Sequence, residues 1–301
     1  MPVYVQNPHP RSLIERSTDD LLAPDTRMGT VELLVRDLDT MIAFYSNGLT
    51  LDVLEQSGET AVLGRGGVPV VRMRRMPDLP PRRQGEAGLF HTAVLFDDEA
   101  SLAAAVASTA RHAPRSFTGS SDHLYSQAFY FDDPEGNGVE LYADRPRETW
   151  ETEPHGLLKV ATNPLDPNEF LRTHLPKASA GAPPATLGHV HLQVGDIGVA
   201  RDFYVDALGF EVMSDVGSAL FIAAGGYHHH IAVNTWGTAG AGPRAAALGL
   251  GQVNIDLPTA DDVDALQERL TDHGIQVRHD GAILRADDPW GTLIQVGVAD
   301  A

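Results

Sequence analysis

Three histidines stand in a row, His228, His229 and His230, in the stretch GGYHHHIAVNTWG at residues 225–237. Imidazole changes its protonation near neutral pH, so a histidine that faces a cavity can act as an acid, a base or a metal ligand. The stretch reads as the start of a β-strand, in which successive side chains face opposite sides. Either His229 or the pair His228 and His230 can therefore point inward, and the rest of the chain must decide between them.

The composition limits the other chemistry that is possible. The 301 residues include no cysteine, which excludes disulfides, thiolate nucleophiles and cysteine-ligated metal sites. Any metal must be held by His, Asp or Glu. The formal charge of −19 disfavours a nucleic-acid backbone as a partner. We expect no membrane span, since no apolar run approaches about twenty residues. Because the N-terminus lacks a secretory signal pattern, we expect a cytoplasmic location.

An internal repeat is the most informative feature of the chain. Three pairs of segments align, beginning at Gly29 and Gly188, at Gly88 and Gly249, and at Asp133 and Asp288. Each copy reads as a strand, an amphipathic helix and three strands, followed by the same order again. The sequence therefore predicts an α+β fold of two tandem modules, each a pair of βαβββ units.

The predicted domain boundaries and helix ends follow from the repeat. We expect an N-terminal extension, a first module, a linker with one short helix, and a second module, at residues 1–27, 28–145, 146–186 and 187–301. Asp37 and Asp196 are expected to cap the first helix of each module. The second helices are expected over roughly residues 98–110 and 259–273, the latter ending at Gly274.

The repeated strand–Asp–helix–FY pattern, together with DPEGNGVEL and GGYHHHIAVNTWG, resembles the vicinal oxygen chelate superfamily. This superfamily contains glyoxalases, bleomycin resistance proteins and dioxygenases, and the chain is similar to its two-module members of the catechol 2,3-dioxygenase type. The resemblance implies that the units form curved, partly open barrels of mixed sheet. Because several chemistries share this fold, the fold alone does not fix the reaction.

The resemblance also implies three recurring metal-ligand places: the starts of the first and fifth strands of a module and the end of the eighth. These places hold Thr30, His91 and Glu140 in the first module and His189, Gln252 and Gln295 in the second. Neither set is complete. If the first half of the second module pairs with the second half of the first, as in relatives that build barrels across modules, then His189, His91 and Glu140 converge. The opposite pairing gathers Thr30, Gln252 and Gln295 into an empty, vestigial site.

Two imidazoles and one carboxylate form the ligand set of non-haem Fe(II) oxygenases, which leaves positions for two substrate oxygens and O₂. The expected cofactor is Fe(II), with Mn(II) as the alternative on the same ligands. His191 is a rival ligand, because it lies two residues after His189 on the same strand face. The position of Asp196 sets the register in favour of His189.

The resemblance implies further site residues. Glyoxalase-type members carry a fourth ligand, a Glu, at the place of Ile231, so the four-ligand isomerase site is broken here. We expect Ile231 to face the barrel interior, which turns His229 inward and His228 and His230 outward. The resemblance then gives His229 the role of a base or hydrogen-bond partner. The alternative is a solvated or interface histidine run.

Tyr130 and His123, which both precede Glu140 in the sequence, match residues of the extradiol enzymes. Tyr130, ten residues before Glu140, stands where they carry a substrate-contacting tyrosine, although a plain core aromatic is the alternative. His123 lies seven residues before Tyr130 and resembles their acid histidine, at a spacing two residues shorter than usual.

The expected function is extradiol-type ring cleavage of a small aromatic diol by O₂. Catechol and hydroquinone remain open as the diol. One rival is a glyoxalase-type isomerase or lyase on the same ligands, and another is a metal-free protein that binds small aromatic compounds. Tandem modules already supply the pairing that single-module relatives obtain by dimerising, so both a monomer and a homo-oligomer are compatible with the sequence.

Overall fold

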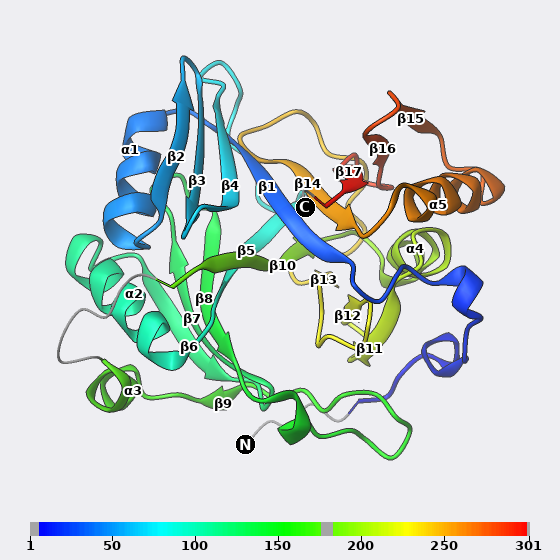
Figure 1. Cartoon of the computed structure of the whole chain (residues 1–301), viewed down its shortest axis with the longest axis horizontal. Helices are drawn as coiled ribbons and strands as arrows, with labels where there is room; N and C mark the ends of the chain where they lie inside the picture. The colour runs from blue at the N-terminus through cyan, green and yellow to red at the C-terminus, as the bar shows by residue number, and fades with distance from the viewer. Residues whose placement is uncertain (1–5, 176–182, 300–301) are drawn as a thin grey trace.

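Four copies of one βαβββ unit make up the fold. A computed structural model describes residues 6–175 and 183–299 of the chain. The helices of the first module gather on one side of the molecule and those of the second module on the other, with long strands crossing between them (Figure 1). The expected α+β fold of paired βαβββ units is confirmed.

The first module contains two units in succession. The first unit consists of β1 (Arg27–Val35), α1 (Leu38–Ala43) with its continuation η3 (Phe44–Gly48), β2 (Asp52–Ser57), β3 (Thr60–Arg65) and β4 (Val68–Arg75). The second consists of β5 (Gly88–Phe96), α2 (Glu99–His112), β6 (Phe117–Asp122), β7 (Ser126–Asp132) and β8 (Gly138–Asp144).

The second module repeats this order. Its first unit consists of β10 (Ala185–Gln193), α4 (Ile197–Arg201) with η5 (Asp202–Ala207), β11 (Glu211–Asp215), β12 (Ala219–Ala223) and β13 (Ile231–Asn234). Its second consists of β14 (Gly249–Leu257), α5 (Ala260–Asp272), β15 (Val277–His279), β16 (Leu284–Asp287) and β17 (Leu293–Val298). Outside the modules lie η1 (Pro10–Leu13), η2 (Thr18–Asp20), η4 (Arg147–Thr149), β9 (Asn163–Pro164) and α3 (Pro167–His174).

The two modules exchange halves. β5 of the first module pairs antiparallel with β10 of the second, and β1 pairs antiparallel with β14. Each of these four strands also pairs in parallel with the last strand of its own unit. The strand order β6-β7-β8-β5-β10-β13-β12-β11 therefore forms one curved sheet, and β2-β3-β4-β1-β14-β17-β16-β15 forms the other. The expected pairing of the first half of module two with the second half of module one is confirmed.

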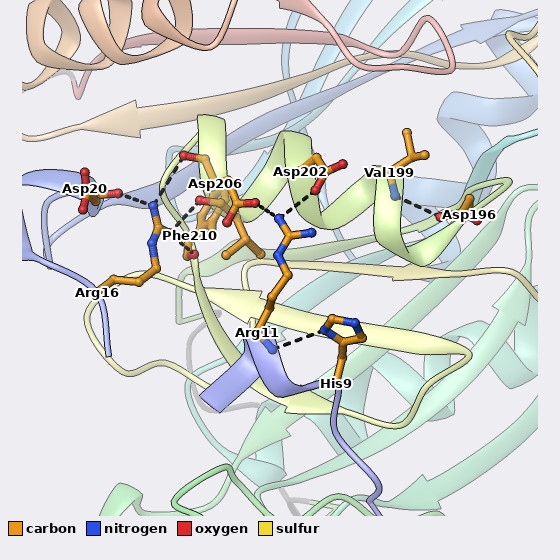
Figure 2. Close-up of polar contacts among 10 residues, drawn as sticks. His9, Arg11, Arg16, Asp20, Asp196, Val199, Asp202, Asp206 and Phe210 are labelled. Atoms are coloured by element: carbon orange, nitrogen blue, oxygen red, sulfur yellow. Dashed lines mark hydrogen bonds and ion pairs between the residues drawn. The ribbon is translucent and has the colours of Figure 1, made fainter. Parts of the chain in front are cut away.

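The helices begin where the sequence predicts. The Asp37 carboxylate accepts the Thr40 N–H at 3.1 Å. The Asp196 carboxylate accepts the Val199 N–H at 2.9 Å, as Figure 2 shows. Each bond satisfies one of the backbone donors that a helix start leaves open. Gly274 follows α5 with φ of 72°, as expected for a helix C-cap. None of the described helices is both long and apolar enough to cross a lipid bilayer.

The N-terminal segment crosses the molecule to pack on the first unit of module two. Arg11 pairs with Asp202 at 2.7 Å and with Asp206, and Arg16 donates to the carbonyl oxygens of Val205 and Phe210 (Figure 2). The ion pairs of Arg11 are exposed, so each contributes little to the stability of the fold. The buried contacts of this segment contribute more.

The carboxylate of Asp215, at the end of β11, is the buried anchor of this segment. It accepts hydrogen bonds from the Ser12 hydroxyl at 2.6 Å and from the His9 backbone at 3.0 Å, and it pairs with Arg201 at 2.8 Å. Asp215 is 1% exposed, and several donors thus compensate its buried charge.

The expected strand register around the three histidines is wrong. β13 begins only at Ile231, and a turn occupies the residues before it. Gly225 and Gly226 have φ of 59° and 68°, values that extended backbone does not adopt. The adjacent glycines were the signal for a turn instead of a strand.

The three histidines do not form a solvated run, so that alternative is wrong. His228, His229 and His230 are 1%, 5% and 8% exposed. Because the turn frees these residues from strand alternation, all three rings can be buried, each in a different environment.

Ile231 does not face the barrel interior. It pairs with Val190 of β10, while His191 pairs with Ala232, and paired residues share one face of a sheet. Ile231 therefore packs in the hydrophobic core on the opposite face from His191. Neither Ala232 nor any other residue of β13 is a carboxylate, so the conclusion that the fourth ligand is missing does not depend on the register.

The burial of His230 predicts a pH dependence of stability. Its Nδ1 accepts the Ala224 N–H at 3.2 Å, and burial lowers the pKa of His230 to about 3. The unfolded chain takes up this proton near its ordinary pKa of about 6.5, so between these values the unfolded state binds more protons. The free energy of unfolding is therefore greatest above about pH 6.5, and this residue lowers it by roughly 2 kcal/mol on going to about pH 5.

Urea denaturation of metal-free protein at about pH 7 and pH 5 tests this expectation. We expect His230→Asn to lose less stability than wild type on acidification, and the exposed His155→Asn to behave as wild type. Burial raises the pKa of Asp133 to about 6, which acts in the opposite direction but equally in all three proteins. The same pH dependence in all three would contradict the account.

Candidate metal centre

The three expected metal ligands lie on three adjacent strands of the composite sheet. His91 is on β5, Glu140 on β8 and His189 on β10, and β5 lies between the other two. Ala93 pairs with both Glu140 and His189, so these three residues lie on one face of the sheet. His91 lies two residues before Ala93 on the same strand and therefore faces the same side. The pairing between modules thus brings imidazoles from both halves onto one concave face.

A β-bulge sets the position of His189. The pairing of β10 with β5 skips Gly188, which leaves His189 opposite Ala93. A Cβ atom at Gly188 would lie 1.8 Å from the Tyr142 hydroxyl oxygen. Only glycine fits this close approach, so the residue before the ligand fixes the local backbone.

The ligand atoms converge. The Glu140 Oε2 lies 2.9 Å from His91 Nε2 and 3.3 Å from His189 Nε2, and the three ligand atoms lie within 4.8 Å of one another. All three side chains are buried. His91 Nε2 is buried and close to the Glu140 carboxylate oxygen but lacks the geometry of a hydrogen bond. Buried polar atoms are rarely left without a partner, so the convergence of the three ligand atoms and the unsatisfied His91 Nε2 together fit a bound divalent ion.

The electrostatics also suit metal binding. Burial lowers the pKa of His189 to about 4, so its imidazole is neutral near pH 7. Burial alone would raise the pKa of Glu140, but the two histidines outweigh it and hold that pKa well below its usual range. A neutral His189 imidazole and an ionised Glu140 carboxylate are in the protonation states that metal ligation requires.

His191 is held in a different role. Its Nε2 lies 2.9 Å from the amide nitrogen of Asn234, which can only donate, so Nε2 accepts and Nδ1 carries the proton. Burial lowers the pKa of His191 well below its usual value. The group that converges on Glu140 contains His189 and not His191.

The residues that meet at the mirrored place in the other sheet are neutral, and the buried Glu32, which pairs with Gln252 across β1 and β14, is bound to Arg74 at 3.0 Å. Asn254 donates to the Thr30 hydroxyl at 2.6 Å and accepts from Gln252 at 3.1 Å, while Gln295 donates to Gln252 at 2.9 Å. The three expected residues therefore do come together, joined by Asn254, which the sequence analysis missed. The amides satisfy one another, and none of these side chains supplies a charge to a cation.

A cavity of about 270 Å³ opens beside the three ligands. Its walls include aromatic side chains from both modules, among them Phe90, Tyr125, Phe221 and Trp236. Glu140 is its only carboxylate, and its described lining includes no lysine or arginine. The space can take a small, uncharged aromatic molecule.

Tyr130 and His123 line this cavity as a hydrogen-bonded pair. His123 Nδ1 lies 2.6 Å from the Ala161 carbonyl oxygen, so Nδ1 carries the proton and donates. In the neutral ring Nε2 then accepts from the Tyr130 hydroxyl, 2.7 Å away. Burial lowers the pKa of His123, which favours this neutral form. Tyr130 also pairs directly with Glu140 across β7 and β8.

His229 lines the same cavity, with its ring centroid 4.0 Å from that of His189. Burial and then the surrounding imidazoles lower the pKa of His229 well below its usual value. His230 lies elsewhere, against Phe210 and Tyr227. The sequence analysis expected His229 at the cavity, but the turn before β13, not strand alternation, places it there.

The segment expected to be a linker contributes to the site. Val160 and Thr162 line the cavity, and the carbonyl of Ala161 between them orients His123. Val216, next to the anchored Asp215, lines it as well. Sequence analysis missed these residues, because nothing in an aperiodic segment indicates which backbone groups it presents.

Comparisons with known proteins agree with the fold. The family model described as the Glyoxalase/Bleomycin resistance protein/Dioxygenase superfamily matches residues 27–141 and 186–296. The chain is 35% identical over 273 residues to a catechol-2,3-dioxygenase of Bacillus subtilis strain 168, covering 88% of this chain and 94% of the relative.

Two solved structures show the same fold at lower identity. A Bacillus subtilis strain 168 protein provisionally assigned as a dioxygenase has a TM-score of 0.63 at 14% identity, over 91% of this chain and 86% of its own. Glyoxalase I from Zea mays has a TM-score of 0.56 at 19% identity, over 91% and 92% of the two chains. With the superfamily model matching both modules, the chain belongs to the Glyoxalase/Bleomycin resistance protein/Dioxygenase superfamily.

Proposed function

We propose that this protein is an extradiol-type dioxygenase that opens the ring of a small aromatic diol at one Fe(II) ion held by His91, Glu140 and His189. The observation that carries the proposal is the convergence of two imidazoles and one carboxylate beside an aromatic cavity. Three protein ligands leave positions open for exogenous oxygens, whereas a structural zinc site is closed by four. The name of the Bacillus subtilis relative supports the same reaction class.

The chain's own residues have distinct parts in this proposal. Bound iron would lower the pKa of a coordinated hydroxyl and hold the diol next to O₂. The Tyr130 hydroxyl, which donates to His123, would orient the substrate oxygen, and His123 would supply or accept a proton at Nε2. His229, next to His189, would act as the base. The aromatic walls would reduce the contact of the reacting groups with water.

The glyoxalase-type alternative lacks support from the ligand set. That chemistry uses a second carboxylate on the strand that corresponds to β13, and β13 contains only Ile, Ala, Val and Asn. The metal-free alternative predicts that freshly purified protein contains no metal, so a measurement of metal content distinguishes it from the proposed function.

Replacing one ligand tests the proposed function. After anaerobic loading with Fe(II), we expect wild type to hold one iron per chain and to consume O₂ with catechol. His91→Ala should lose the iron and reduce oxygen uptake by more than about 100-fold, since it removes a ligand and not only an outer partner. The measurements are iron content and oxygen consumption, with Mn(II) loading in parallel.

Gln252→Ala is the matched control, because Gln252 occupies the mirrored place in the other sheet. We expect its iron content and oxygen uptake to stay within about twofold of wild type, because substitutions at distant sites usually act independently. Equal loss in both variants would overturn the assignment of one live and one vestigial site.

The cavity lining, which includes the Glu140 carboxylate but no lysine or arginine, predicts a preference among diols. A ring carboxylate would lose its hydration without meeting a cation in the cavity lining. We expect kcat/KM for catechol or 3-methylcatechol to exceed that for 3,4-dihydroxybenzoate by at least about tenfold, equivalent to roughly 1.4 kcal/mol. Steady-state oxygen uptake measures this ratio, with methylhydroquinone included to compare a para-diol. Equal kcat/KM values for the neutral and carboxylated catechols would contradict the proposed binding mode.

A further inference from the structure

A chain of hydrogen bonds runs from a carboxylate at the end of β8 through two of the consecutive histidines to the cavity. Asp144 Oδ1 lies 2.9 Å from His228 Nε2, and His228 Nδ1 lies 2.7 Å from His229 Nδ1. Both rings are buried, and His229 lines the cavity. Asp144 follows the proposed ligand Glu140 by four residues on the same strand.

The partners leave one arrangement of protons for neutral rings. An ionised carboxylate only accepts, so His228 Nε2 carries a proton and donates it to Asp144. A neutral His228 then has a bare Nδ1, which must accept from the Nδ1–H of His229. His229 is consequently left with a bare Nε2. Within the described residues, no protein group donates a hydrogen bond to this nitrogen.

The surroundings hold the carboxylate and the middle ring of this chain in place. The Tyr227 hydroxyl donates to Asp144 Oδ2 at 2.9 Å and also meets the Tyr142 hydroxyl at 2.8 Å. Tyr125 stacks on the His228 ring, with centroids 4.5 Å apart and an interplanar angle of 15°. The Asp144 carboxylate accepts from two donors, and the His228 ring is held by stacking. Each therefore has few alternative orientations.

The second site has no such chain. In the sequence repeat, Glu140 aligns with Gln295, so Asp144 aligns with Ala299. The carboxylate is therefore present only in the half-barrel that holds the proposed metal ligands.

We propose that Asp144 and His228 are positioning residues that hold His229 in the tautomer whose bare Nε2 faces the substrate. The inference rests on the proposed function only for the part in which this bare nitrogen accepts a hydrogen bond from a substrate hydroxyl.

The tautomer is measurable without metal or substrate. Long-range ¹H–¹⁵N NMR of metal-free protein distinguishes protonated from bare imidazole nitrogens, and the His229→Gln spectrum assigns the His229 signals. We expect wild-type His229 to carry its proton on Nδ1. Asp144→Ala removes the acceptor for His228, and His228→Phe removes the acceptor for His229 while keeping the ring stacked on Tyr125. Both variants should shift His229 toward a mixture of tautomers.

Two further variants serve as controls. Asp144→Asn keeps an oxygen acceptor and should retain the wild-type tautomer. Asp287→Ala removes a carboxylate at the end of β16, far along the chain from this group, and should leave the His229 signals unchanged. In iron-loaded protein, Asp144→Ala and His228→Phe should lower kcat about tenfold or more, with KM within about twofold, and Asp144→Asn should recover much of kcat.

A wild-type His229 protonated on Nε2, or an unchanged tautomer in both Asp144→Ala and His228→Phe, would overturn the inference. An equal loss of kcat in Asp144→Asn and Asp144→Ala with the Asn tautomer intact would overturn the positioning role. If the tautomers respond as expected but the wild-type protein cleaves no diol, the proposed function fails while the hydrogen-bond assignment stands.

Discussion

The antiparallel pairing of β5 with β10 is the contact on which the rest of the site depends. It joins the second half of one module to the first half of the other and places His91 and His189 on a common face. Because the side-chain period of a strand is two, a slip of one residue between these strands would turn the His189 imidazole to the opposite face from His91 and Glu140. The bulge at Gly188, where the close approach of Tyr142 admits only glycine, sets this register next to His189.

Duplication has given two sheets of the same topology with different polar contents. One sheet gathers a buried carboxylate and imidazoles, whose cost of burial a bound ion would offset. The other gathers Thr30, Gln252, Asn254 and Gln295, which satisfy one another by hydrogen bonds. Neutral amides need no ion to be stable in a partly buried place. A few side chains thus decide which of two equivalent places is suited to metal chemistry.

The repeat and its periodicity predicted the repeated units, and the resemblance to the superfamily implied the exchange of halves and the convergence of His91, Glu140 and His189. Sequence analysis failed at Gly225–His230, where two glycines with positive φ break the strand that alternation assumed. His229 reached the cavity through this turn, so its placement was expected for the wrong reason. The roles of Ala161 and Asp144 were not predictable, since a backbone carbonyl and a strand-end carboxylate gain meaning only from distant partners.

The most direct test of the central claim is a crystal structure of protein loaded anaerobically with Fe(II), with anomalous scattering recorded at the iron edge. The account predicts one anomalous peak per chain, bound by nitrogens of His91 and His189 and by the Glu140 carboxylate. A peak among Thr30, Gln252 and Gln295, ligation by His191 in place of His189, or no peak near Glu140 would contradict it.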